Sequence, residues 1–108
     1  MEHLSYRFEH GQRPVPQQAE LVGVVSSGNL EVLIEACPLQ QACVIEINTA
    51  ATGFGAIWAA VMTDFNARWL LADVRITIND MGATPAVVSL RLDQAVETLF
   101  GQPQGAQA

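Results

Sequence analysis

The chain has 108 residues, and half of them are hydrophobic, which is enough for the core of one compact domain. Eleven acidic residues against five basic ones, all of them arginine, give a formal net charge of −6. A protein that binds nucleic acid needs a basic surface to displace counterions from the phosphates. We therefore expect no nucleic-acid partner.

The first ten residues are polar and lack the basic flank and apolar run of a secretory signal. No stretch reaches roughly 18 uninterrupted apolar residues, the length that a membrane span requires. The cysteines, Cys37 and Cys43, are too few for a disulfide scaffold, and a reducing compartment would oppose a bond between them. These features favour a cytoplasmic protein with no membrane partner.

The first half of the chain predicts strands. Apolar and polar residues alternate in residues 4–8, and strand-like runs follow at 21–25, 30–36 and 43–47. The last three runs are joined by short connections, so we expect them to pair as an antiparallel meander. The segment 11–18 contains Gly and Pro and predicts an irregular connector.

The hydrophobic period lengthens after Thr52, which is expected to be the N-cap of a helix. The apolar residues that follow have the spacing of one stripe of an amphipathic helix. This stripe comprises Phe54, Ile57, Trp58, Val61, Met62 and Phe65. A strand returns at 74–78, and residues 79–82 predict the turn that ends it.

The last element fits a strand at 88–93 as well as a helix, but its flanking residues favour the helix. Thr84 can cap it, Pro85 suits the first helical position, and Gly101 can close it in the left-handed conformation. The buried stripe of this helix would contain Val88, Leu92, Ala95, Val96 and Leu99.

These elements predict an α+β fold, a two-layer sandwich with a mainly antiparallel sheet and two helices packed on one face. The expected organisation is an N-terminal strand and connector in residues 1–19, the main domain in 20–100 and a flexible tail in 101–108.

The polar segment Ser26-Ser27-Gly28-Asn29 lies between two strand patterns. Gly-Asn in this position indicates a two-residue hairpin, because glycine accepts the positive φ of a type II′ turn. We expect Ser27 at the tip with its hydroxyl outward, within reach of a modifying enzyme. Serine and glycine are also ordinary turn residues, so these letters alone favour a purely structural turn.

Two blocks of the sequence resemble the acyl-carrier subunits of malonate decarboxylase. LVGVVSSGNLEVL, residues 21–33, is similar to the segment that carries the prosthetic group in that family, and ITINDMGATPAVVSLRLDQ, residues 76–94, is similar to its second distinctive block. Two blocks in the right order are stronger evidence than one. The citrate lyase acyl-carrier (gamma) subunit is similar in organisation, but the Gly-Ala-Thr-Pro run favours the malonate family.

The resemblance implies that Ser27 carries a covalently attached phosphoribosyl-dephospho-coenzyme A group, with Gly28 and Asn29 beside it. Ser26 stands where the family more often has glycine, so it remains the alternative anchor, and Asn29 stands where aspartate is usual. The implied partners are the acyltransferase and decarboxylase subunits, the transferase that attaches the group, and a malonyl-CoA acyltransferase. The arm would carry acetyl and malonyl thioesters while these partners catalyse, so we expect a non-catalytic chain.

Two other functions stay open: a citrate lyase-type carrier, and a small regulatory or ligand-binding domain in which 26–29 is only a hairpin. An enzyme is the weakest interpretation, because the sequence shows no set of nucleophile, base and orienter and no glycine-rich phosphate loop. His3 and His10 lack metal-ligand spacing, so we expect no metal site.

The remaining candidate residues predict structural roles. Cys43 falls on the inward face of a strand, where cysteine behaves as a small hydrophobe. Glu31 and Glu35 are expected on a solvated sheet face. Trp58 belongs to the core stripe, and Trp69 receives no predicted role.

Overall fold

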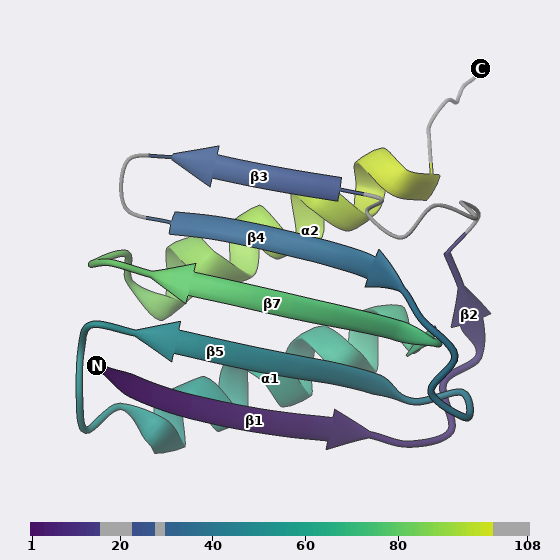
Figure 1. The fold of residues 1–108 in the computed structure, drawn as a ribbon, viewed down its shortest axis with the longest axis horizontal. Helices are drawn as coiled ribbons and strands as arrows, with labels where there is room; N and C mark the ends of the chain where they lie inside the picture. Colours follow the sequence, from purple (N-terminus) through teal and green to yellow (C-terminus); the bar gives the residue numbers. More distant parts are fainter. Residues whose placement is uncertain (16–22, 28–29, 101–108) are drawn as a thin grey trace.

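In the computed structural model, a five-stranded sheet is covered on one face by two helices (Figure 1). Residues 1–15, 23–27 and 30–100 are described, the second range through its backbone. The sheet contains β1 (Glu2–Phe8), β3 (Gly23–Ser27), β4 (Leu30–Ala36), β5 (Cys43–Thr49) and β7 (Val74–Asp80), and the helices are α1 (Gly55–Trp69) and α2 (Pro85–Phe100). The predicted two-layer α+β sandwich is confirmed.

The strand order is β1-β5-β7-β4-β3, which differs from the predicted meander. β3 and β4 do form an antiparallel pair, but β7 lies between β4 and β5 and runs parallel to β5. A parallel pair needs a crossover connection, and α1 supplies it between β5 and β7. The prediction of a meander was wrong because alternation marks a strand without identifying its neighbours.

A second, smaller sheet pairs β2 (Arg13–Pro14) with β6 (Leu71–Ala72) in parallel. The backbone N–H groups of Gln12 and Arg13 both donate to the carbonyl oxygen of Leu70, at 2.8 and 2.9 Å. The expectation of an irregular connector at 11–18 was therefore wrong at Arg13–Pro14, whose partners lie far along the chain.

α1 begins later than predicted and buries a narrower stripe. Its N-cap is Phe54, without a side-chain cap hydrogen bond, so the assignment of Thr52 as N-cap was wrong. Trp58, Met62 and Phe65 are buried, whereas Phe54 and Ile57 are 43% and 48% exposed. Ile57 precedes Trp58 by one residue, about 100° around the helix, which turns its side chain away from the sheet.

α2 agrees with the sequence in its start and in its buried face. Pro85 is its first residue, and the hydroxyl of Thr84 accepts a hydrogen bond from the backbone N–H of Val87 at 3.3 Å. All five residues of the predicted stripe are buried: Val88, Leu92, Ala95, Val96 and Leu99. Gly101, the predicted C-terminal glycine, lies outside the described residues.

The core lies between the helices and the inner face of the sheet. β4, β5 and β7 each bury alternate residues on this face. Its hydrophobic residues with no exposed surface are Val32, Ile34, Cys43, Ile45, Ile47, Val74, Ile76 and Ile78. Such an alternation turns the intervening residues toward the opposite face.

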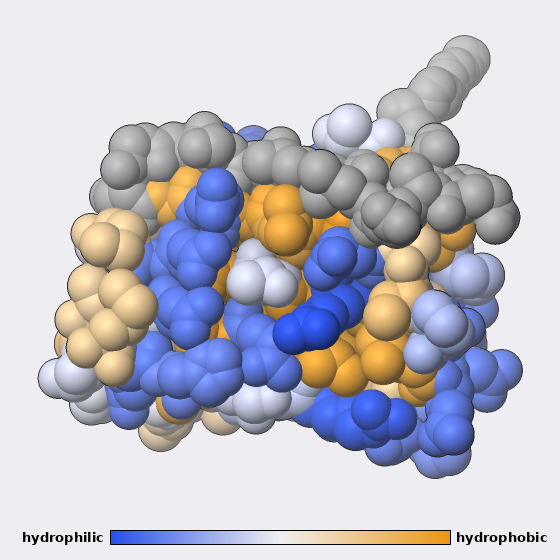
Figure 2. Space-filling model, in the orientation of Figure 1, coloured by the Kyte–Doolittle hydropathy of each residue, from blue (hydrophilic) through white to orange (hydrophobic). Residues whose placement is uncertain are grey.

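That opposite face is open in the part of the chain that the structure describes, and Figure 2 shows a hydrophilic band crossing its strands. A chain of side-chain hydrogen bonds follows one register row. His3 Nδ1 lies 2.7 Å from Asn48 Oδ1, Asn48 Nδ2 donates to Asn79 Oδ1 at 2.9 Å, and Asn79 Nδ2 donates to Glu31 Oε1 at 3.0 Å. The expectation that Glu31 is solvated holds, since its side chain is exposed.

Candidate functional site

Ser27 is the last residue of β3, which is an edge strand of the sheet. It pairs with Leu30, the first residue of β4, so only residues 28 and 29 connect the two strands. Gly28, Asn29 and the side chain of Ser27 lie outside the described residues, so the type II′ turn and the outward hydroxyl stay predictions. The backbone register nevertheless locates Ser27 at one end of the sheet.

The second block of the sequence reaches the same end of the sheet. Asp80 ends β7 and pairs with Leu30 on one side and with Thr49 on the other. Ser27, Leu30, Asp80 and Thr49 therefore form one register row across four strands. The strand order, rather than proximity in sequence, brings the two blocks together.

The carboxylate of Asp80 organises the loop between β7 and α2. It is 1% exposed, accepts a hydrogen bond from the Thr49 hydroxyl at 2.8 Å, and accepts two more from the backbone N–H groups of Gly82 and Ala83 at 3.1 and 2.7 Å. A short acidic side chain that binds the backbone two and three residues later is typical of a turn. Gly82 has a φ of 136°, which favours glycine.

A cavity of about 230 Å³ lies beside this loop. It is formed between the start of α1 and the loop that leads into α2, and its lining is largely apolar. The lining residues are Ala51, Phe54, Trp58, Asp80, Gly82, Ala83, Thr84 and Pro85. Sequence reasoning missed this cavity, because its walls come from two segments with no shared motif. The Asp-x-Gly pattern was the one local signal that pointed to a structured turn.

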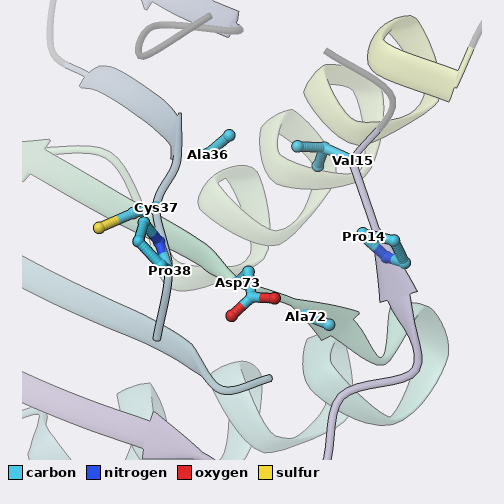
Figure 3. A pocket seen from close by; sticks show the side chains of 7 residues that line it. All are labelled: Pro14, Val15, Ala36, Cys37, Pro38, Ala72 and Asp73. Carbon is cyan, nitrogen blue, oxygen red and sulfur yellow. The ribbon is translucent and has the colours of Figure 1, made fainter. Parts of the chain in front are cut away.

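A larger hollow, of about 360 Å³, lies at the opposite end of the sheet, where β4 ends and β7 begins (Figure 3). Its lining includes Cys37, whose sulfur points away from Val15 and Ala72. Asp73 also lines it and accepts hydrogen bonds from the backbone N–H groups of Leu39 and Gln41, both at 2.9 Å. These two hydrogen bonds lower the pKa of Asp73, and the bond from Leu39 has the larger effect.

The other titratable candidates have structural surroundings. Both cysteines are free, so the disulfide is not formed, and burial of Cys43 raises its pKa to about 12. His3 and His10 are exposed, as expected. The hydrogen bond with Asn48, followed by interactions with Glu46, raises the pKa of His3. No group of three metal-ligating side chains occurs within residues 1–15, 23–27 and 30–100.

Trp69, which had no predicted role, is the last residue of α1 and contacts residues of α2 and β2. Its indole Nε1 donates to Asp93 Oδ1 at 2.9 Å, and its ring stacks on Phe100 with centroids 6.2 Å apart. The guanidinium of Arg13 lies 5.7 Å from the Trp69 ring centroid. Trp69 therefore joins α1, α2 and β2.

The sequence of residues 17–99 matches the family of malonate decarboxylase delta subunits, which are acyl carrier proteins. The chain belongs to this family. It is 66% identical over 103 residues to the malonate decarboxylase acyl carrier protein of Xanthomonas euvesicatoria pv. vesicatoria (strain 85-10), covering 94% of this chain and 97% of that one. It is 60% identical over 106 residues to that of Stenotrophomonas maltophilia (strain K279a), covering 96% and 100%.

The fold of this acyl carrier subunit also resembles a solved one. A chain in the crystal structure of a Pseudomonas malonate decarboxylase hetero-tetramer in complex with malonate is 34% identical, with a TM-score of 0.72, and the match covers 92% of this chain and 99% of that chain. Family membership favours the malonate enzyme over the citrate lyase alternative and over an unrelated regulatory domain. None of the helices in the described ranges has the length and apolar character to cross a bilayer.

Proposed function

We propose that this acyl carrier holds acetyl and malonyl thioesters on a phosphoribosyl-dephospho-coenzyme A group joined to the hydroxyl of Ser27 by a phosphodiester. The observation that carries the proposal is the position of Ser27 at the end of edge strand β3, inside the range that matches the carrier family. Gly28 and Asn29 are proposed to flank the linkage.

The residues at this end fit such a group. Serine supplies the oxygen that a phosphodiester needs, and an edge strand has a side that no other strand of its sheet occupies, which lets a modifying enzyme approach. The group, when attached, supplies a thiol on a long flexible arm. The chain therefore needs only to hold one attachment residue on a stable sheet. The pairing of Ser27 with Leu30, and of Leu30 with Asp80, places Ser27 on such a sheet.

The catalytic steps are proposed to belong to partner proteins: the acyltransferase and decarboxylase subunits, the transferase that attaches the group, and a malonyl-CoA acyltransferase. The related Pseudomonas structure is a hetero-tetramer, which supports partner subunits. A tethered arm raises the local concentration of its acyl group at their active sites. The net charge of −6 favours partners with basic docking surfaces, and the two free cysteines suit the cytoplasm.

Intact mass spectrometry after co-expression with the transferase and the enzyme that makes its substrate tests the anchor. Wild-type carrier and Ser26→Ala are expected to gain the mass of the group, and Ser27→Ala is expected to remain unmodified because it lacks the oxygen. Circular dichroism should show the same fold in all three proteins. An adduct on Ser27→Ala that is lost in Ser26→Ala would move the anchor to Ser26, and unmodified wild-type carrier would contradict the proposal.

A further inference from the structure

We propose that the cavity beside the β7–α2 loop, called the acyl pocket here, binds the acetyl thioester end of the arm and excludes the malonyl thioester. The acyl pocket is defined by the eight lining residues Ala51, Phe54, Trp58, Asp80, Gly82, Ala83, Thr84 and Pro85. This inference rests on the proposed attachment at Ser27 and adds a substrate-selective role for the carrier itself.

The acyl pocket lies within reach of an arm anchored at Ser27. Asp80 lines the pocket and is two strands from Ser27 in the same register row, with Leu30 between them. Neighbouring strands are about 4.8 Å apart, so the two backbones are separated by about 10 Å. An arm built of ribose, pantothenate and cysteamine units is longer than this distance, so its thiol end can fold back into the pocket.

The size and lining of the acyl pocket suit a small neutral acyl group. Its volume of about 230 Å³ is below the roughly 300–1,000 Å³ of pockets for drug-sized ligands. Trp58 is 1% exposed and forms an apolar wall, whereas Phe54, which also lines the pocket, is 43% exposed. A methyl group entering the pocket would exchange water for contact with apolar side chains.

The acyl pocket is expected to distinguish the acetyl from the malonyl group by charge. Among the described residues that line it, Asp80 alone is charged, and no cation lines it. The Asp80 carboxylate already accepts hydrogen bonds from Thr49, Gly82 and Ala83 and is held in place by them. A malonyl carboxylate would lose its hydration and meet a charge of the same sign, which is unfavourable at short range. The acetyl thioester carries no charge and avoids both costs.

The carrier would then protect the acetyl thioester and leave the malonyl thioester exposed. The acetyl thioester, which waits for the next malonate, would be shielded from water. The malonyl thioester would stay outside, available to the partner that decarboxylates it.

Nuclear magnetic resonance on the complete carrier tests the acyl pocket directly. The transferase attaches the arm as its acetyl or malonyl thioester, with ¹³C in the acetyl methyl or the malonyl methylene group, and intact mass confirms loading. NOEs are expected from the acetyl methyl to the Trp58 ring and the Ala83 methyl, and none from the malonyl methylene. A fully loaded carrier without acetyl NOEs, or with equal NOEs from both groups, overturns the acyl pocket alone, whereas an absent adduct overturns the attachment and the pocket together.

The rate of thioester cleavage by hydroxylamine gives a second measurement. Ala83→Leu fills the acyl pocket, and Ala86→Leu makes the same change at an exposed position of α2 outside it. Cleavage of the acetyl thioester is expected to be about fivefold faster in Ala83→Leu than in wild-type carrier and unchanged in Ala86→Leu. Equal rates in all three overturn the pocket, and the wild-type NOE measurement decides even where Ala83→Leu does not fold.

Discussion

Cys43 shows at the scale of one residue how burial sets reactivity. It lies at the start of β5 with no exposed surface, and desolvation of its thiolate raises its pKa from 9.0 to about 12. Cys37, at the end of β4, is partly exposed. The thiolate is the reactive form, so the two cysteines are chemically different despite lying six residues apart in the sequence.

We expect high pH to weaken the fold through Cys43. Between pH 9 and about 12 the native state keeps the thiol proton while the unfolded state loses it, so the free energy of unfolding falls as the pH rises through this window. Urea denaturation at pH 9 and 11 should show a smaller loss in Cys43→Ala than in wild-type carrier. Cys37→Ala, the matched control, should keep the wild-type loss. An identical loss in all three proteins would contradict this account of Cys43.

The loop between β7 and α2 shows how one element joins the two layers. Asp80 holds the backbone of Gly82 and Ala83, Thr84 caps the helix, and Pro85 begins it. Each residue of the Asp-x-Gly-Ala-Thr-Pro block other than Met81 thus has a local task or lines the acyl pocket. Sequence comparison alone identified this block as distinctive, and the structure explains why these residue types occur in it.

Removing the Asp80 side chain should destabilise this loop. Asp80→Ala leaves the Ala83 N–H and the buried Thr49 hydroxyl without their partners, which costs on the order of 2–3 kcal/mol of unfolding free energy. The matched control is Asp64→Ala, because Asp64 is exposed on α1 and pairs with Arg68 at the surface. The control should change stability by no more than about 0.5 kcal/mol. Urea denaturation measures both, and equal values would refute the role assigned to Asp80.

At the scale of the whole molecule, the crossover from β5 through α1 to β7 determines the architecture. It places β7 in the middle of the sheet, between β5 and β4, and packs α1 on the inner face (Figure 1). Trp58 is the largest of the fully buried side chains and belongs to the core cluster that joins both layers. The stability of the fold should therefore be sensitive to this one side chain.

Trp58→Ala is expected to cost about 3–5 kcal/mol, the range for deleting a buried aromatic side chain. Ile57→Ala is the neighbouring control, since Ile57 is 48% exposed, and its cost should stay within about 0.5 kcal/mol. Thermal and urea denaturation compare the two. A thermal shift near zero for Trp58→Ala would contradict its place in the core stripe of α1.

Local signals in the sequence were sufficient to predict several elements. The boundaries of β4, the start of α2 and its five buried residues followed from periodicity and capping, because both depend on residues a few positions apart. The resemblance of two blocks identified the carrier family and predicted Ser27 as the attachment residue. The match to the family of malonate decarboxylase delta subunits supports the family assignment. The attachment itself stays a prediction, as does the division into residues 1–19, 20–100 and 101–108.

The contacts between segments that are distant in the sequence became known from the folded chain. The place of β7 between β4 and β5, the exposure of Phe54 and Ile57, and the row that joins Ser27 to Asp80 all depend on contacts across long stretches of chain. Thr49 and Asp80 are 31 residues apart, and the sequence around either residue does not predict their hydrogen bond. Periodicity reports which face of an element is apolar, whereas packing between layers selects its neighbour and creates the cavity beside it.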